Sequence, residues 1–132
     1  MNKMPDAERG IEREAPESTQ EPLSNPTINL AEKILAEVSF ENRFIGYKLR
    51  ERAGAIPVTA YSFEEVVNLL KDRLPLVNLE ALAKWLREVI GDEEIADKIA
   101  AVREQGKSDR ECTLLVRDLA KTRLSQCKAL MA

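Results

Sequence analysis

The sequence predicts an all-α protein, a compact helical bundle of five to six helices built from helical hairpins. Two observations lead to this fold class: apolar residues recur at spacings of three and four along most of the chain, and side chains suited to capping precede these runs. The 132 residues are enough for one domain with a hydrophobic core, and the hydrophobic content of 44% is ordinary for a globular chain. We therefore expect a single helical domain over residues 27–132.

Residues 1–26 are predicted to form a disordered acidic tail. The segment has almost no large apolar side chains, and four prolines interrupt it. It holds six acidic residues against three basic ones, so the rest of a chain whose net charge is -3 is close to neutral. A neutral domain argues against strong nonspecific binding to nucleic acid, because that binding depends on basic residues that neutralise phosphates.

The first expected helix begins at Asn29, which can act as its N-cap. From Phe40 the register of the apolar residues changes, and we expect a kink or a second short helix that Gly54 ends. Residues 55–60 are the only β-like stretch, and Pro57 within it makes a strand unfavourable. The prediction for 55–60 is an extended linker packed on the helices.

The centre of the predicted core is a helical hairpin. Ser62 and Glu65 form a capping box that starts its first helix, which Pro75 is expected to end. Asn78 is suited to cap the second helix, and Gly91 is suited to end it in a left-handed conformation. Both helices have broad apolar faces, so each is expected to contact more than one neighbour.

Two further helices complete the predicted bundle. Asp92 is expected to cap a helix that Gly106 ends, and Ser108 with Glu111 forms a second capping box. The last helix is the longest and is predicted to reach about Leu130.

Residues 92–120 resemble 62–90 in the spacing of their acidic, apolar and capping positions, with a period of about 30 residues. One interpretation is a two-fold repeat of a helical hairpin. The other is that any two amphipathic hairpins align their apolar positions.

The residue types needed for catalysis or metal binding are scarce. The chain has no histidine, and its two cysteines lie on one predicted helix about 22 Å apart, too far to bridge or to share a metal. Clusters of carboxylates occur at predicted helix starts, where capping explains them. We therefore expect no enzyme activity, no cofactor and no metal.

The sequence has no apolar run long enough for a membrane span and no apolar core of a signal peptide. We expect a cytoplasmic protein with reduced thiols and no membrane partner.

The predicted binding surface is a mixed basic and apolar face of the last helix. Two leucines flank its basic stripe, a position where a merely solvated face has little use for them. The hypothesis is a non-enzymatic interaction module (an adaptor, a regulatory subunit or an oligomerisation domain) that docks an acidic protein partner or a second copy in a homodimer. The alternative is ordinary solvating charge beside scattered surface leucines. The candidate residues are Arg110, Leu114, Arg117, Lys121, Leu124 and Lys128.

A second hypothesis is binding to DNA or RNA. Basic and aromatic side chains are interleaved before Gly54, a pattern that suits phosphate contacts and base stacking. The last helix could also enter a groove of nucleic acid, although its acidic residues oppose phosphate contact. The residues of this alternative patch are Arg43, Phe44, Tyr47, Lys48, Arg50 and Arg52.

Overall fold

The computed structural model describes residues 23–132, and its architecture is mixed α and β. The prediction of an all-α bundle is therefore wrong, because three strands form an antiparallel sheet beside the helices. The predicted tail falls mostly on residues 1–22, which lie outside the described residues. The helices are α1 (Ile28–Leu35), α2 (Phe63–Leu70), α3 (Leu79–Trp85), α4 (Glu93–Arg103) and α5 (Asp109–Met131), and the strands are β2 (Phe44–Arg50), β3 (Gly54–Ala60) and β4 (Pro75–Leu76).

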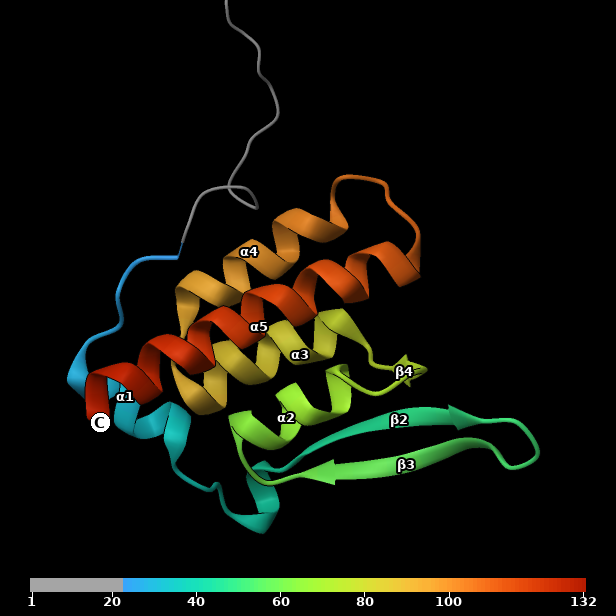
Figure 1. Cartoon of the computed structure of the whole chain (residues 1–132), viewed down its shortest axis with the longest axis horizontal. Coiled ribbons are helices and arrows are strands. Elements are labelled where there is room, and N and C mark those ends of the chain that lie inside the picture. The colour runs from blue at the N-terminus through green and yellow to red at the C-terminus, as the bar shows by residue number, and fades with distance from the viewer. Residues whose placement is uncertain (1–22) are drawn as a thin grey trace, which may run out of the picture.

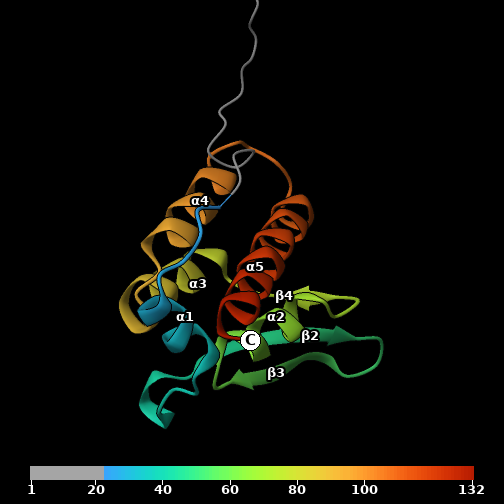
Figure 2. The same cartoon turned by 60° about the vertical axis from the view of Figure 1, so that its left-hand side comes forward.

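The strand order in the sheet is β3-β2-β4. Helix α2 packs on one face of the β2–β3 hairpin and also packs against α5, so it lies between the sheet and the remaining helices (Figure 1). Helix α1 lies along the C-terminal part of α5, and the far end of the hairpin projects beyond the helices (Figures 1 and 2). The side chains of β2 that point away from α2 are exposed.

The β2–β3 hairpin replaces the helix and linker that were expected between residues 40 and 60. Only Phe40–Asn42 forms a single 3-10 turn, after which β2 and β3 pair from Phe44↔Ala60 to Arg50↔Gly54. Gly54 has a φ of 74°, so its left-handed conformation serves the hairpin turn and not a helix end. Pro57 is tolerated because β3 is an edge strand.

The predicted helix caps are confirmed at four positions. The side chains of Ser62, Asn78, Asp92 and Ser108 each accept a hydrogen bond from the amide three residues later. The full capping box is present at Ser108 but not at Ser62, where Glu65 accepts from the Tyr61 amide instead. The start of α1 was predicted wrongly, since Thr27 caps it two residues before Asn29. Threonine and asparagine both cap helices, so local chemistry alone did not distinguish the two positions.

Two predicted helix ends, at Gly91 and Gly106, agree with the structure, whereas the end predicted at Pro75 does not. Helix α3 continues as a π-helical turn over Leu86–Ile90, and Gly91 ends it with a φ of 90°. Gly106, with a φ of 74°, follows α4 as expected. Helix α2 instead ends at Leu70, because Pro75 begins strand β4 and the chain must first leave the helix.

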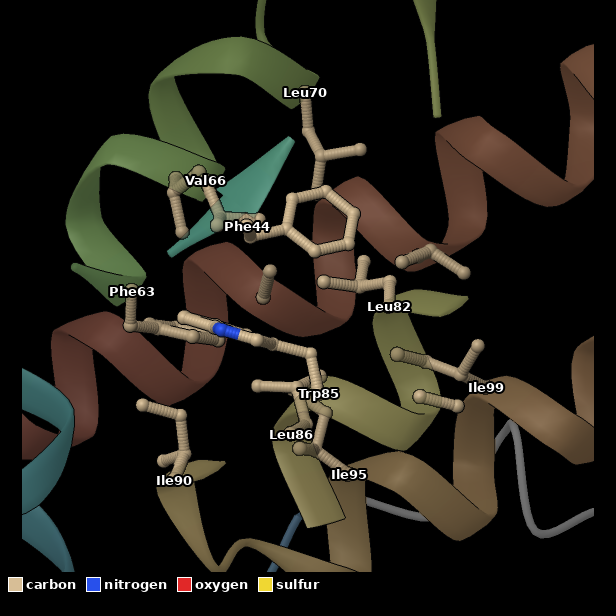
Figure 3. Close-up of a cluster of buried hydrophobic side chains, with 14 of the residues drawn as sticks. Phe44, Phe63, Val66, Leu70, Leu82, Trp85, Leu86, Ile90, Ile95 and Ile99 are labelled. Carbon is tan, nitrogen blue, oxygen red and sulfur yellow. The ribbon is translucent and has the colours of Figure 1, made fainter. Parts of the chain in front are cut away.

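The core joins the helices to the start of β2. The ring of Phe44 lies 5.7 Å from that of Trp85, and the Trp85 indole Nε1 donates to the carbonyl of Asn42 at 2.6 Å (Figure 3). Buried aliphatic side chains of α2, α3 and α4 surround the pair. The hairpin is therefore anchored in the core by its first residues, whereas the residues of its turn are exposed.

Gly46 allows α2 to approach the sheet closely. It lies on the inner face of β2, and a Cβ built there would come within 2.5 Å of Leu69 Cδ2. A side chain at this position would therefore displace either the Leu69 side chain or α2 itself.

None of the helices within residues 23–132 is long and apolar enough to cross a membrane. The two predicted hairpins also differ in their connections, because the first contains strand β4 and the second does not. The duplication stays a prediction.

Candidate partner-binding groove

A groove of about 870 Å³ is lined by residues of strands β2 and β4 and by the first half of α5. The apolar floor of the groove consists of Ile45, Tyr47 and Leu49 from β2, Leu76 from β4 and Leu114 from α5. The loop after α2 and the end of α4 close the remaining sides. Segments that are far apart in the sequence therefore build one concave surface.

The apolar side chains on this surface are unusually exposed. Ile45, Tyr47 and Leu49 alternate with the inward-facing residues of β2, and their exposed fractions are 44%, 41% and 36%. Leu76 pairs with Tyr47 across the sheet and is 49% exposed, and Leu114 is 36% exposed. Side chains opposite each other in a sheet share a face, so these residues form one apolar patch.

The rim of the groove is basic. Six of its lining residues are lysine or arginine and two are aspartate, in a chain whose total charge is -3. Within residues 23–132, Arg73, Lys107 and Arg110 form no ion pair and no side-chain hydrogen bond. Arg117 pairs only with the neighbouring Asp118 at 3.2 Å, and Asp118 is largely exposed. The positive charge of the rim is therefore not neutralised by the described residues.

One of the two acidic residues is already engaged. Asp72 accepts from Arg50 at 2.8 Å and 3.0 Å in a two-pronged pair, and it also accepts from the Leu74 amide. The hydrogen bonds from Arg50 and then from Leu74 hold the pKa of Asp72 well below its usual range. This pair fixes the loop that begins the groove wall.

The structure places half of the predicted docking face in the groove. Arg110, Leu114 and Arg117 lie on successive turns of α5 and line it together. These three are the predicted residues that the structure brings together.

The other half of the predicted face does not reach the groove. Leu124 is 9% exposed and belongs to the core, and Lys128 pairs with Glu64 of α2 at 2.9 Å. Lys121 is exposed on α5 but does not line the groove. The second half of α5 does not line the groove because α1 and α2 pack against it.

The first residues of the alternative nucleic-acid patch are occupied by contacts within the chain. Phe44 is buried in the core, 5% exposed. The guanidinium of Arg43 lies 3.8 Å from the centre of the Phe40 ring and donates to the Phe40 carbonyl.

The remaining residues of that patch lie on different faces. Tyr47 is on the outer face of the sheet and lines the groove, whereas Lys48 and Arg50 alternate with it and point to the other face. Arg50 is paired with Asp72, and Arg52 is in the hairpin turn. The predicted patch is therefore not a single surface, because successive side chains of strand β2 point to opposite faces of the sheet.

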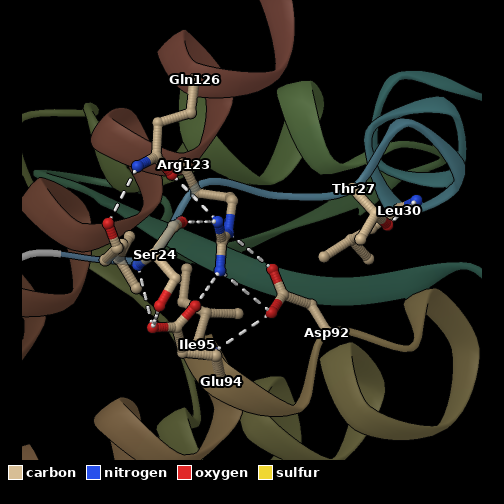
Figure 4. A network of polar contacts seen from close by, with 9 residues as sticks. Ser24, Thr27, Leu30, Asp92, Glu94, Ile95, Arg123 and Gln126 are labelled. Carbon is tan, nitrogen blue, oxygen red and sulfur yellow. Dashed lines mark hydrogen bonds and ion pairs between the residues drawn. The ribbon is translucent and has the colours of Figure 1, made fainter. Parts of the chain in front are cut away.

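A buried ionic cluster is the feature that sequence reasoning missed (Figure 4). Arg123 of α5 and Asp92, the cap of α4, are each 1% exposed and pair at 2.9 Å. Arg123 also binds Glu94 at 2.7 Å and the carbonyl of Ser24 at 2.8 Å. Arg123 thereby joins α5, the start of α4 and the first described residues.

The residues before α1 are held by this cluster. Glu94 accepts from both the amide and the hydroxyl of Ser24, and Gln126 donates to the carbonyl of Leu23. Burial raises the pKa of Glu94, but the hydrogen bonds from Ser24 and Arg123 outweigh it, so the net pKa is lowered. Residues 23 and 24 were assigned to the predicted tail, whereas here they contact α4 and α5.

A sequence signal for Arg123 did exist. The buried positions of α5 recur as Cys112, Val116, Ala120, Arg123 and Cys127, at spacings of four, four, three and four. A charged residue at one place of an apolar stripe indicates a buried partner. Asp92 could not be identified as that partner, because 31 residues separate the two.

No protein-family model, curated protein or solved structure matches this chain. Among residues 23–132, no three histidine, cysteine, aspartate or glutamate side chains are placed to hold a metal ion. The functional assignment therefore depends on the geometry of the groove.

Proposed function

We propose that this chain is a non-enzymatic interaction module that docks an acidic segment of a partner protein in the groove between the sheet and α5. The observation that carries the proposal is an exposed apolar floor inside a rim of six basic and two acidic residues. Covering an apolar floor removes its unfavourable contact with water. A rim of lysine and arginine side chains attracts acidic partners.

The composition of the floor favours a protein over nucleic acid. Single-stranded nucleic acid is held by stacking bases on several aromatic rings. Here Tyr47 is the one aromatic residue that lines the groove, and Ile45, Leu49, Leu76 and Leu114 are aliphatic. Aliphatic floors suit the leucine, isoleucine and phenylalanine side chains of a protein segment.

We also propose a reducing, cytoplasmic setting. Cys112 and Cys127 are both free and buried, which fits a compartment that keeps thiols reduced. A fluorescent fusion of the full chain tests this: fluorescence confined to an oxidising compartment would contradict it.

The proposal is tested by cross-linking the full chain in its own cells, followed by mass spectrometry. The variant is Leu114→Glu, which puts an acid on the exposed floor, and the control is Lys121→Glu, an exposed position on the same helix outside the groove. Circular dichroism checks that both variants are folded. We expect acidic segments of partner proteins to cross-link to the wild type and the control and to be lost from the variant.

Three outcomes would overturn the proposal. One is an identical set of cross-links for all three chains. Another is a single-stranded oligonucleotide that binds the wild type and not Leu114→Glu. The third is a dimer in light scattering that Leu114→Glu dissociates, which would make a second copy the occupant of the groove.

A further inference from the structure

We infer that the docked segment is an amphipathic helix with acidic flanks, and that it does not bind as an added strand. This inference rests on the proposed function and specifies the form of the partner. It follows from how the two open edges of the sheet are built.

The backbone direction of each strand residue can be read from the β2–β4 pairing. The amide of Leu49 donates to the carbonyl of Leu74 at 2.8 Å, so this is a hydrogen-bonded pair. Pairs alternate along an antiparallel ladder, so Tyr47 also bonds toward β4, whereas Gly46 and Lys48 bond toward β3.

Both open edges carry a proline where an outward amide is needed. Pro57 of β3 lies opposite Tyr47, so its nitrogen points away from β2 toward the open edge. Pro75 of β4 lies opposite Lys48, so its nitrogen points away from β2 on the other side. A proline has no N–H, so neither edge offers a regular ladder to an incoming strand.

A segment buried in this groove must therefore form its backbone hydrogen bonds within itself. Backbone N–H and C=O groups that leave water need partners, and a helix supplies them internally. A polyproline segment could also bind without adding a strand to the sheet, but such segments dock in grooves lined by several aromatic rings. In this groove Tyr47 is the single aromatic lining residue.

The dimensions and charges of the groove fit a short helix. A helix about 10 Å across occupies about 400 Å³ per turn, so the groove volume of about 870 Å³ is comparable with that of roughly two turns. Apolar side chains three and four residues apart would cover Tyr47, Leu76 and Leu114. Acidic side chains on the flanks would reach Arg110 and Arg117.

The test is a selection of random 16-residue peptides displayed on phage against the full-length wild type. Peptides retained by Leu114→Glu are removed, and Lys121→Glu is the matched control that must retain the selected ones. We expect the selected peptides to be acidic, to carry apolar residues three and four apart, and to gain helical circular dichroism on binding.

Two variants, one of the peptide and one of the protein, make the test quantitative. Proline at a central exposed position of the best peptide should weaken binding about tenfold or more relative to alanine there, because proline disrupts a helix. Arg110→Glu/Arg117→Glu in the protein should weaken the same peptide by about tenfold or more.

The outcomes separate the two proposals. Selected peptides that need Leu114 but alternate apolar and polar residues, or that tolerate the proline, overturn the helix and leave the docking function intact. Selected peptides that bind the double arginine variant as well as the wild type overturn the acidic flanks. Failure to select any peptide that depends on Leu114 counts against both.

Discussion

Arg123 shows how a single charged residue can organise the interior of a small domain. Its guanidinium bonds two carboxylates and a backbone carbonyl while its side chain is 1% exposed. Burying a charge is costly unless it is paired and fully hydrogen-bonded, and here Asp92, Glu94 and Ser24 supply these bonds. The cluster therefore specifies how three segments meet.

Removal of Arg123 should be among the most destabilising single changes. Arg123→Met leaves the Asp92 carboxylate buried without its counter-charge, so we expect a loss of about 3–5 kcal/mol in the free energy of unfolding. Urea denaturation followed by circular dichroism measures it.

The control for this change is Lys121→Met, an exposed neighbour on α5, which should stay within about 0.5 kcal/mol of the wild type. The double variant Arg123→Met/Asp92→Asn should regain part of the loss, since asparagine still caps α4 and carries no charge. A single variant as stable as the wild type would show that the ion pair contributes nothing.

Glu94 predicts a local response to acid. Its pKa is lowered in the folded chain, so the stabilisation it gives is fully present above the ordinary glutamate value of about 4.3 and is lost as the pH falls through the lower folded pKa. The Ser24 amide donates a hydrogen bond to the Glu94 carboxylate. The NMR chemical shift of this amide should therefore change only at a pH below the ordinary glutamate pKa.

Glu94→Gln is the matched control for the titration. We expect it to remove the acid transition of the Ser24 amide, because glutamine does not ionise in this range. A transition at or above the ordinary glutamate pKa would contradict the assignment.

Secondary-structure elements were predictable where a local interaction defines them. The caps at Ser62, Asn78 and Ser108 depend on side chains and amides three residues apart, and the sequence contains that information directly. The π-helical turn before Gly91 had no such signal, although its end did.

The β2–β3 hairpin was not predictable from periodicity. Its apolar residues Ile45, Tyr47 and Leu49 lie on the exposed face, while Lys48 occupies the covered face. The usual alternation of a buried apolar face with a polar outer face is thus partly inverted. The inversion has a physical reason if the exposed face is the docking floor.

The packing of α2 on the sheet gives a prediction at this scale. Gly46→Ala puts a Cβ within 2.5 Å of Leu69 Cδ2 unless the Leu69 side chain or α2 shifts. We expect a loss of about 1–3 kcal/mol in the free energy of unfolding from this overpacking, measured by urea denaturation.

A double-mutant cycle supplies the control. Leu69→Ala alone creates a cavity, and Gly46→Ala/Leu69→Ala should cost less than the sum of the two single changes because the new methyl group has room. Strict additivity would show that the contact between Gly46 and Leu69 does not limit the approach of α2.

At the scale of the whole molecule, the groove could be predicted only in part. Arg110, Leu114 and Arg117 were identified because they share one helix face. Ile45 and Leu76 join them through a sheet that the sequence did not reveal and a loop that is distant along the chain. Such a surface depends on tertiary packing, which local patterns do not encode.

The two thiols report on opening of the whole domain. Cys112 and Cys127 are buried on α5, and burial raises the pKa of Cys127. We expect a thiol reagent to react slowly with the native protein at neutral pH and rapidly with both cysteines in urea. Fast reaction of the native protein would show that α5 separates from its neighbours without global unfolding.

The prolines at the sheet edges have a second consequence, for aggregation. Replacing both, as Pro57→Thr/Pro75→Thr, restores the outward amides and should shorten the lag before thioflavin T fluorescence rises in concentrated solution. Pro26→Thr, outside the sheet, is the control and should leave the lag unchanged.

A protein that leaves an apolar sheet face open for a partner runs the risk of fibril growth, because every copy could stack on the next through its strand edges. With Pro57 and Pro75 in place, stacked copies cannot form a continuous cross-β ladder. The two imide nitrogens thus keep the strands beside an exposed apolar face from templating a polymer of the chain.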